Sequence, residues 1–240
     1  MTSVLFNNVD HHDLRVIARG GAEFGDAVNQ VMVFPTEFEI IQREFPIVLR
    51  PDPEGRLRPV ALLGLARDEN LFLDPEEGWR SAAIPALLQR GPFSIAAPPD
   101  DEAEPMIRID TDHPRLSREE GEPLFLPHGG KTRYLEGVMD ALRAIYIGNP
   151  LLDPMAEAFT DLELLQPVNL ELQVAEGEAY AISDAQTIDR ARLAALGAAG
   201  LETLHRAGFL HSAFMIAASL ANLQRLVDMK SAARQPHQAS

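Results

Sequence analysis

The spacing of apolar residues changes at Gly129-Gly130, and this change constrains the fold more than any other feature of the chain. Before these glycines, short apolar runs stand between prolines, glycines and acidic residues, which is typical of strands joined by turns. After them, apolar residues recur at helical spacing. Strand and helix patterns do not alternate regularly, so a doubly wound sheet is not expected. The pattern predicts an α+β protein with an antiparallel, strand-rich N-terminal half that contains short helices, and a helical C-terminal half.

The N-terminal half is expected to hold several strands and turns. Short apolar runs predict strands at 31–34, 47–49, 93–96 and 106–109. Prolines, glycine and acidic residues predict a turn at 51–55 and a solvated loop at 100–102. The apolar runs 59–65 and 70–73 are separated by four residues, which predicts a β-hairpin.

Two short helices are also predicted in this half. Thr36 and Glu39 have the spacing of a capping box, which would start a helix that ends before Pro46. Ser81 is expected to cap a second short helix that reaches Arg90.

The C-terminal half is expected to contain long helices and one β-hairpin. Residues 132–147 and 151–165 predict two helices, the first with an apolar face of Leu135, Val138, Met139, Leu142 and Ile145. Strict alternation over 168–174 predicts a half-buried strand, which turns at 176–177 into a partner around 179–182. Residues 184–228 predict two or three more helices, followed by a frayed tail from Ser231.

The boundary near residue 130 is expected to separate two subdomains rather than two independent domains. Residues 1–130 form the strand-rich part, and residues 131–240 form the mainly helical part with its hairpin, within one compact domain. The apolar stretch 207–223 falls short of the length of a membrane span, so a buried core helix is expected there.

Charge and cysteine content narrow the function. The formal charge of −15 repels nucleic acids and anionic membranes, so neither is an expected partner. The absence of cysteine excludes disulfides, thiolate nucleophiles and cysteine-ligated metals. The first sixteen residues lack a basic region followed by a long apolar run, so we expect no signal peptide and a cytoplasmic location.

Residues 110–125, DTDHPRLSREEGEPLF, form a polar segment without an amphipathic period, here called the signature segment. Asp110, Asp112 and His113 could hold a metal ion if His205 or His211 supplied a second imidazole. The competing interpretation is a turn before Pro114 with solvated charges.

The rest of the signature segment offers an anion pocket or a set of internal salt bridges. Arg115, Ser117 and Arg118 could grip a carboxylate or phosphate. Glu119, Glu120 and Glu122 stand close enough to neutralise the arginines instead, and we favour salt bridges that order the loop. Ser117 would act as a nucleophile only beside a histidine, and neither G-x-S-x-G nor S-x-x-K surrounds it.

Two further groups of polar residues lie outside this segment. His11-His12, with Asp13 and Arg15, forms either a second site or a polar N-terminal loop. Near the other end, the ligand-binding candidates are His205, Asn222 and Arg225, the last two on one helix face. His211, Ser219 and Asn222 are expected to form a hydrogen-bonded core network. Phosphate-loop, dinucleotide and H-E-x-x-H motifs are absent, so no cofactor is predicted.

Several strings in order resemble the SapC family over nearly the full length of the chain. They are FPIV (45–48), PVALLGL (59–65), NLF (70–72), the sole tryptophan Trp79, IPA (84–86), PF (92–93), PRLS (114–117), EGEPLF (120–125), LHRAG (204–208) and SLANL (219–223). The resemblance implies a bacterial protein whose family name comes from surface layers. Genes of the family resemble neighbours of genes for halogenase-like proteins and outer-membrane receptors, which implies a link to nutrient uptake or metabolism. The resemblance supplies no catalytic residues.

Two functional hypotheses remain. The first is a soluble, non-catalytic binding or accessory protein in an uptake or surface-associated pathway, whose partner is an unknown small molecule or protein. The second is a metal-dependent enzyme that uses Asp110, Asp112 and His113. Assembly into a homo-oligomer is compatible with either.

Overall fold

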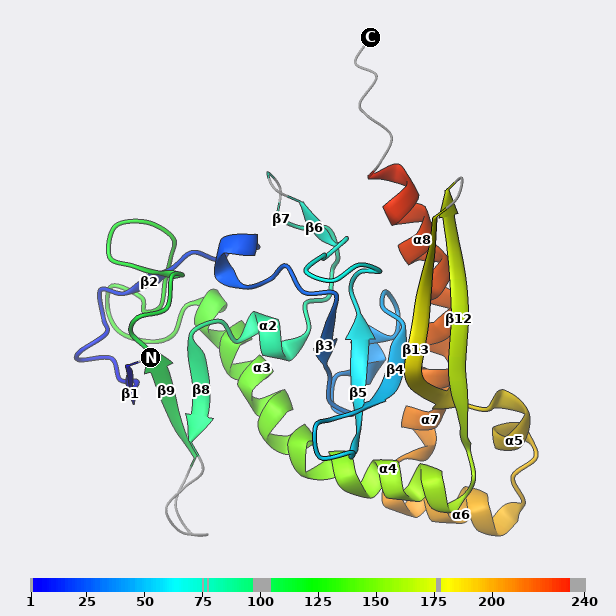
Figure 1. Cartoon of the computed structure of the whole chain (residues 1–240). Helices are drawn as coiled ribbons and strands as arrows, with labels where there is room; N and C mark the ends of the chain where they lie inside the picture. Colours follow the sequence, from blue (N-terminus) through cyan, green and yellow to red (C-terminus); the bar gives the residue numbers. More distant parts are fainter. Residues whose placement is uncertain (1, 75, 77, 97–104, 176–177, 234–240) are drawn as a thin grey trace.

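The computed structural model describes residues 2–74, 76, 78–96, 105–175 and 178–233 (Figure 1). Every strand pairing among them is antiparallel. Sheets lie mostly in the N-terminal half and helices mostly in the C-terminal half, which confirms the α+β class. The loop predicted at 100–102 and the turn at 176–177 lie outside the described residues.

A five-stranded sheet forms the centre of the molecule. Its order is β12 (Leu165–Ala175), β13 (Glu178–Ile188), β4 (Ile47–Pro51), β5 (Leu57–Leu62) and β3 (Gln30–Met32). The predicted turn after β4 is present: the Asp52 carboxylate accepts the backbone N–H groups of Glu54 and Arg56, and Gly55 has a φ of 81°. The C-terminal hairpin therefore completes a sheet that the N-terminal half begins.

The C-terminal helices pack on this sheet or on one another. They are α4 (Leu152–Asp161), α5 (Arg190–Ala194), α6 (Ala198–Ala207), α7 (Leu210–Ser219), η3 (Leu220–Asn222) and α8 (Leu223–Ala232). Helix α7 contacts β13 and β4, α8 contacts β12, and α4 contacts β5. The main core between them is closed by fully buried aromatic side chains, among them Phe38, Phe45, Phe72 and Phe159. In the part of the chain that the structure describes, no helix is long and apolar enough to cross a membrane.

A second, smaller core lies beside the first. It is enclosed by the sheet β1 (Ser3–Leu5), β9 (Met106–Asp110) and β8 (Phe93–Ala96), and by the sheet β10 (Leu116–Ser117), β2 (Arg15–Val16) and β11 (Glu122–Pro123). Leu135, Val138 and Leu142 cover it from α3 (Arg133–Gly148), as their spacing predicted. Figure 1 shows α3 running from these small sheets towards η2 (Asn149–Leu151) and α4.

The remaining short elements connect the two cores. They are η1 (Ala22–Phe24), α1 (Phe38–Ile41), α2 (Ala86–Gln89) and the ribbon of β6 (Leu73–Asp74) with β7 (Gly78–Trp79).

The capping box predicted at Thr36 is wrong. Helix α1 has a single turn, and the residue before it is Glu37. The Thr36 hydroxyl donates instead to the carbonyl of Ala144 in α3, at 2.8 Å, and Glu39 pairs with Arg43. A tertiary contact with α3 has therefore replaced the local cap.

The hairpin predicted from 59–65 and 70–73 is also wrong. Strand β5 pairs with β4 and β3, and β6 pairs with β7. Both edges of β5 are occupied by β4 and β3. The Glu69 carboxylate accepts the N–H groups of Leu65 and Ala66, and among the described residues the returning chain makes a single backbone hydrogen bond, from Leu71 to the Leu63 carbonyl, instead of a paired strand.

Three helix boundaries need correction. Ser81 does not cap α2, because its hydroxyl donates to Ala83 and the helix starts after Pro85. The second predicted helix, 151–165, ends at Asp161, because Leu165 already pairs with Ile188. That pairing also makes 184–188 part of β13, and the described residues after it form four α-helices rather than two or three. Ser231 still belongs to α8, where its hydroxyl donates to Val174.

Candidate functional site

The signature segment is held in place by Arg115, which is almost completely buried. Its Nη1 atom donates to the carbonyls of Ile17, at 2.8 Å, and Arg19, at 2.6 Å. Its Nη2 atom forms an ion pair with the buried carboxylate of Asp26, and the guanidinium lies 4.4 Å from the centre of the Phe24 ring. Burial of a guanidinium needs this degree of pairing.

Asp26 also forms hydrogen bonds with two other segments. Its carboxylate accepts the N–H of Gly21 at 2.9 Å, and its carbonyl accepts the side-chain amide of Asn70 at 2.9 Å. Arg115 therefore joins the signature segment to η1 and to the loop before β6. Arg115 and Arg118 do form ion pairs, but with Asp26 and Asp13. The prediction of internal salt bridges to the neighbouring glutamates is therefore wrong.

Ser117 ends β10, Glu122 begins β11, and Glu120 lies in the turn between them. The Ser117 hydroxyl oxygen accepts the N–H groups of Glu119 and Glu120, each at 3.1 Å, while Glu120 and Glu122 are exposed. Gly121 makes the turn possible: its φ is 99°, and a Cβ there would lie 2.5 Å from the Val16 carbonyl oxygen.

The side chains proposed as metal ligands form hydrogen bonds with backbone groups of the protein. Asp112 accepts the N–H of Thr2 at 2.9 Å, and this bond holds its pKa below the usual value. Asp110 accepts the N–H of Asp112, and His113 Nδ1 accepts that of Arg115. Burial, aided by Arg115, lowers the pKa of His113, so its ring is neutral at pH 7. The described residues contain no cluster of three or more histidine or acidic side chains that could hold a metal ion.

The C-terminal candidates lie far from this segment. His205 is exposed on α6, and His211 starts α7, at the β12–β13 end of the molecule, whereas β10 and β11 pair with β2 at the other end (Figure 1). Asn222 donates to the carbonyl of Gln42 at 2.8 Å. Arg225 pairs with Glu44 at 3.2 Å and lies over the Phe72 ring. Asn222 and Arg225 thus attach the last helices to the chain that follows α1.

The signature segment and the N-terminal loop line a common hollow of about 340 Å³, here called the N-terminal hollow. Its polar lining comes from Asp10 and His11 on one side and from Thr111, Ser117 and Arg118 on the other. His11 is only 7% exposed. Its Nδ1 atom lies 3.0 Å from the carbonyl oxygen and 3.2 Å from the amide nitrogen of Asn7, and the other ring nitrogen forms no hydrogen bond among the described residues.

The sequence pattern grouped His11 with His12, Asp13 and Arg15, but the His12 ring bonds to the carbonyl of Val9. The two histidines therefore do not act together. The pairing of β2 with β10 brings His11 beside Ser117, and this long-range contact has no local sequence pattern.

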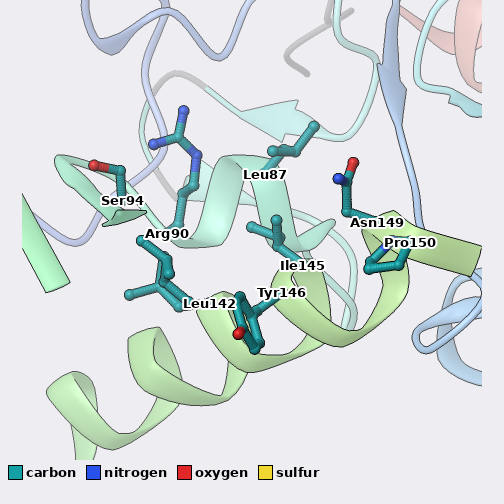
Figure 2. Close-up of a pocket in the computed structure, with 9 residues that line it drawn as sticks. Leu87, Arg90, Ser94, Leu142, Ile145, Tyr146, Asn149 and Pro150 are labelled. Carbon is teal, nitrogen blue, oxygen red and sulfur yellow. The ribbon is translucent and has the colours of Figure 1, made fainter. Parts of the chain in front are cut away.

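A second hollow, of about 420 Å³, lies between α2 and α3 and was missed by sequence reasoning. Figure 2 shows Arg90 and Ser94 at one end, Asn149 and Pro150 at the other, and the side chains of Leu142 and Ile145 between them. Arg90 donates to the Phe93 carbonyl at 2.7 Å, and burial lowers its pKa. The hollow is mainly apolar, and its α3 residues had the pattern of ordinary core positions.

The family model of SapC matches residues 6–226, which includes nearly all of both cores, the signature segment and the first turn of α8. The chain belongs to the SapC family. No curated protein and no solved structure matched it. For this SapC-family protein, the candidate site is therefore defined by its own geometry.

Proposed function

We propose that this SapC-family protein is a non-catalytic binding protein with an accessory role in a bacterial uptake or surface-associated pathway. The proposed ligand is a small polar molecule, and the proposed site is the N-terminal hollow. The observation that carries the proposal is a nearly buried His11 that lines the same hollow as Ser117 and Arg118. We also propose a cytoplasmic location, although a cysteine-free composition fits a reducing cytoplasm and many bacterial surface proteins equally.

The polar groups of the hollow suit a ligand that both donates and accepts hydrogen bonds. The Ser117 oxygen accepts two backbone N–H groups, so its proton is available to a ligand. The Thr111 hydroxyl donates to Thr2, at 3.0 Å, which leaves its oxygen as an acceptor. Arg118 is already paired with Asp13, so it supplies a partly neutralised charge at the rim.

The geometry favours binding over catalysis. A serine nucleophile needs a base within hydrogen-bond reach. Among the described residues, Ser117 forms its hydrogen bonds with backbone N–H groups, and none is formed with a histidine. Ser117 therefore has the contacts of a turn residue that faces a hollow.

A thermal-shift screen tests the proposal. Free amino acids, hydroxy acids and monosaccharides are each added to the purified protein, and a ligand is expected to raise Tm with the logarithm of its concentration once that exceeds Kd. The shift should be lost in Ser117→Ala and His11→Gln, and kept in Ser94→Ala, which alters the other hollow.

Three outcomes would overturn the proposal. The first is a screen in which no compound raises Tm. The second is a shift that survives both Ser117→Ala and His11→Gln. The third is turnover of a compound that Ser117→Ala abolishes, which would make the protein an enzyme. Iron, manganese or zinc bound to untagged purified protein would instead favour the metal-dependent alternative at Asp110, Asp112 and His113.

A further inference from the structure

A third cavity, of about 310 Å³, lies between α1, the chain before α2, and α3, and is here called the Glu37 cavity. Its walls are mostly alanine and isoleucine side chains, with Ile41 and Ala86 both buried. The polar side chains that line it are Thr36, Glu37, Gln89 and Asp140. It therefore combines a carbon-lined space with a small number of polar groups, the usual make-up of a ligand site.

Glu37 is the only one of these polar side chains that is buried, with 8% of the residue exposed. Its Oε1 atom accepts the N–H of Phe34 at 3.0 Å, and its Oε2 atom accepts the N–H of Ala86 at 2.8 Å. A carboxylate offers about four acceptor positions, so these two bonds leave roughly half of them free. Among the described residues, no lysine, arginine or histidine forms an ion pair with Glu37.

The other polar side chains that line the Glu37 cavity also offer hydrogen-bond acceptors. The Thr36 hydroxyl donates its proton to Ala144, at 2.8 Å, and the Gln89 amide nitrogen donates to Gly137, at 3.4 Å. The Thr36 oxygen and the Gln89 carbonyl oxygen remain to accept. Asp140 is exposed and adds a second carboxylate at the rim. A ligand that fits this lining brings hydrogen-bond donors and positive charge.

We propose that the Glu37 cavity binds a primary ammonium group carried on a short apolar body. The ammonium has three donors, which match the carboxylate of Glu37, the carbonyl of Gln89 and the rim carboxylate of Asp140. The alanine and isoleucine walls cover the carbon skeleton. This site goes beyond the binding function proposed above, because it shares no residue with the N-terminal hollow.

The ionisation of Glu37 agrees with this assignment. Burial raises the pKa of Glu37 to about 7, although its two backbone hydrogen bonds lower it. The other charged groups around the cavity are Asp140 on α3 and the exposed pair of Glu39, on α1, with Arg43, which follows it. Glu44 accepts the N–H groups of Ala82 and Ala83 in the cavity wall, and its charge is paired with Arg225. An ammonium binds only the ionised carboxylate well, so affinity should rise as pH increases from 6 to 8. For a group with a pKa near 7, the expected rise is about tenfold.

Calorimetry with 2-phenylethylammonium chloride tests the site, with 2-phenylethanol as the neutral analogue and 3-phenylpropionate as the anionic one. Wild-type protein is expected to bind the ammonium at least about tenfold more tightly than either analogue at pH 8. Glu37→Gln should lose at least about tenfold in affinity and the pH dependence with it. Glu39→Gln, two residues along the chain in α1 and paired with Arg43 in solvent, is the matched control and should leave binding unchanged.

A second variant covers the case in which Glu37→Gln does not fold. Ala82 lines the cavity but is exposed, so Ala82→Leu should narrow the entrance and weaken ammonium binding without changing the carboxylate. The proposal is overturned if the folded wild type binds no ammonium at millimolar concentration, or if the alcohol binds equally well. Affinity that is equal at pH 6 and pH 8, or that is unaffected in Ala82→Leu, would overturn it too.

Discussion

The guanidinium of Arg115 and the carboxylate of Asp26 form an ion pair whose side chains are only 7% and 4% exposed. The two residues come from segments far apart in the chain, and each makes further hydrogen bonds to a third segment. Loss of one partner would leave the other charge buried without compensation. The pair is therefore a sensitive point in the attachment of the signature segment to the rest of the fold.

Arg115→Ala is expected to lower the free energy of unfolding by about 3–5 kcal/mol, the usual effect of breaking a buried ion pair. Urea denaturation followed by circular dichroism measures the change. Asp26→Ala should have a similar effect, and the double variant should lose less than the sum of the two.

Arg118→Ala is the control for this experiment. Its ion pair with Asp13 has side chains 62% and 42% exposed, so its loss should change stability by less than about 1 kcal/mol. Equal effects at Arg115 and Arg118 would contradict the structural role of the buried pair.

Glu37 should make stability fall as pH rises. Its pKa is about 7 in the folded protein against an ordinary 4.5, so between these values the folded state binds the proton and the unfolded state does not. At about 1.4 kcal/mol per pH unit, this contribution amounts to about 3 kcal/mol.

The lowered pKa of His113 makes stability rise with pH below pH 6.5, which opposes the effect of Glu37. The contribution of Glu37 therefore has to be isolated by a variant. Denaturation of the wild type and Glu37→Gln is measured from pH 5 to pH 8. The difference in stability between them should shift steadily in favour of Glu37→Gln as pH rises, and a constant difference would rule out the raised pKa.

Ser219→Ala should destabilise the contact between α7 and β4. The fully buried Ser219 hydroxyl accepts the N–H of Ile47 at 2.8 Å and donates to Ile216 at 2.7 Å. Alanine would leave a buried N–H unpaired, at a cost of about 1–3 kcal/mol. Chemical denaturation measures this loss. Thr203→Ala, at an exposed hydroxyl on α6, should change stability by less than about 0.5 kcal/mol, and an equal loss there would contradict the argument.

Gly121→Ala should disturb the turn of the signature segment. The positive φ strains any side chain, and the added Cβ would overlap the Val16 carbonyl, so a loss of about 2–4 kcal/mol is expected. Thermal unfolding measures it. Gly197 provides the contrast, because its φ is −71° and no atom lies within 4 Å of an added Cβ. Gly197→Ala is expected to change stability by less than about 0.5 kcal/mol, and tolerance of both substitutions would show that the turn can relax.

The helices and strands that were predicted best are those with long patterns of apolar residues in the sequence. Residues 132–147 carry four turns of apolar spacing and a capping Thr132, and α3 forms there with the expected buried face. The alternation over 168–174 likewise lies within β12. The short patterns failed: Thr36 and Ser81 had the right residue types for caps, yet each hydroxyl donates to a carbonyl instead. A single hydrogen bond of about 1 kcal/mol is easily replaced by a tertiary contact of similar strength.

The candidate site was predicted only in part. Residue types within 110–125 indicated ordering by ion pairs, but the partners Asp13 and Asp26 lie about a hundred residues earlier in the chain and have no local pattern. Glu37 was not singled out at all, because a glutamate before a short helix looks like an exposed residue. Its burial arises from α2 and α3, which close over it.

The sequence alone determined the α+β class, the family and the long elements, because periodic burial of apolar residues is a property of the local chain. Tertiary structure alone decided which polar residues are buried and what they meet. His11 and Ser117 line one hollow, Arg115 pairs with Asp26, and Glu37 lines a cavity where no described cation pairs with it. These contacts depend on strand pairing and helix packing between distant segments, and burial then sets the strength of each interaction.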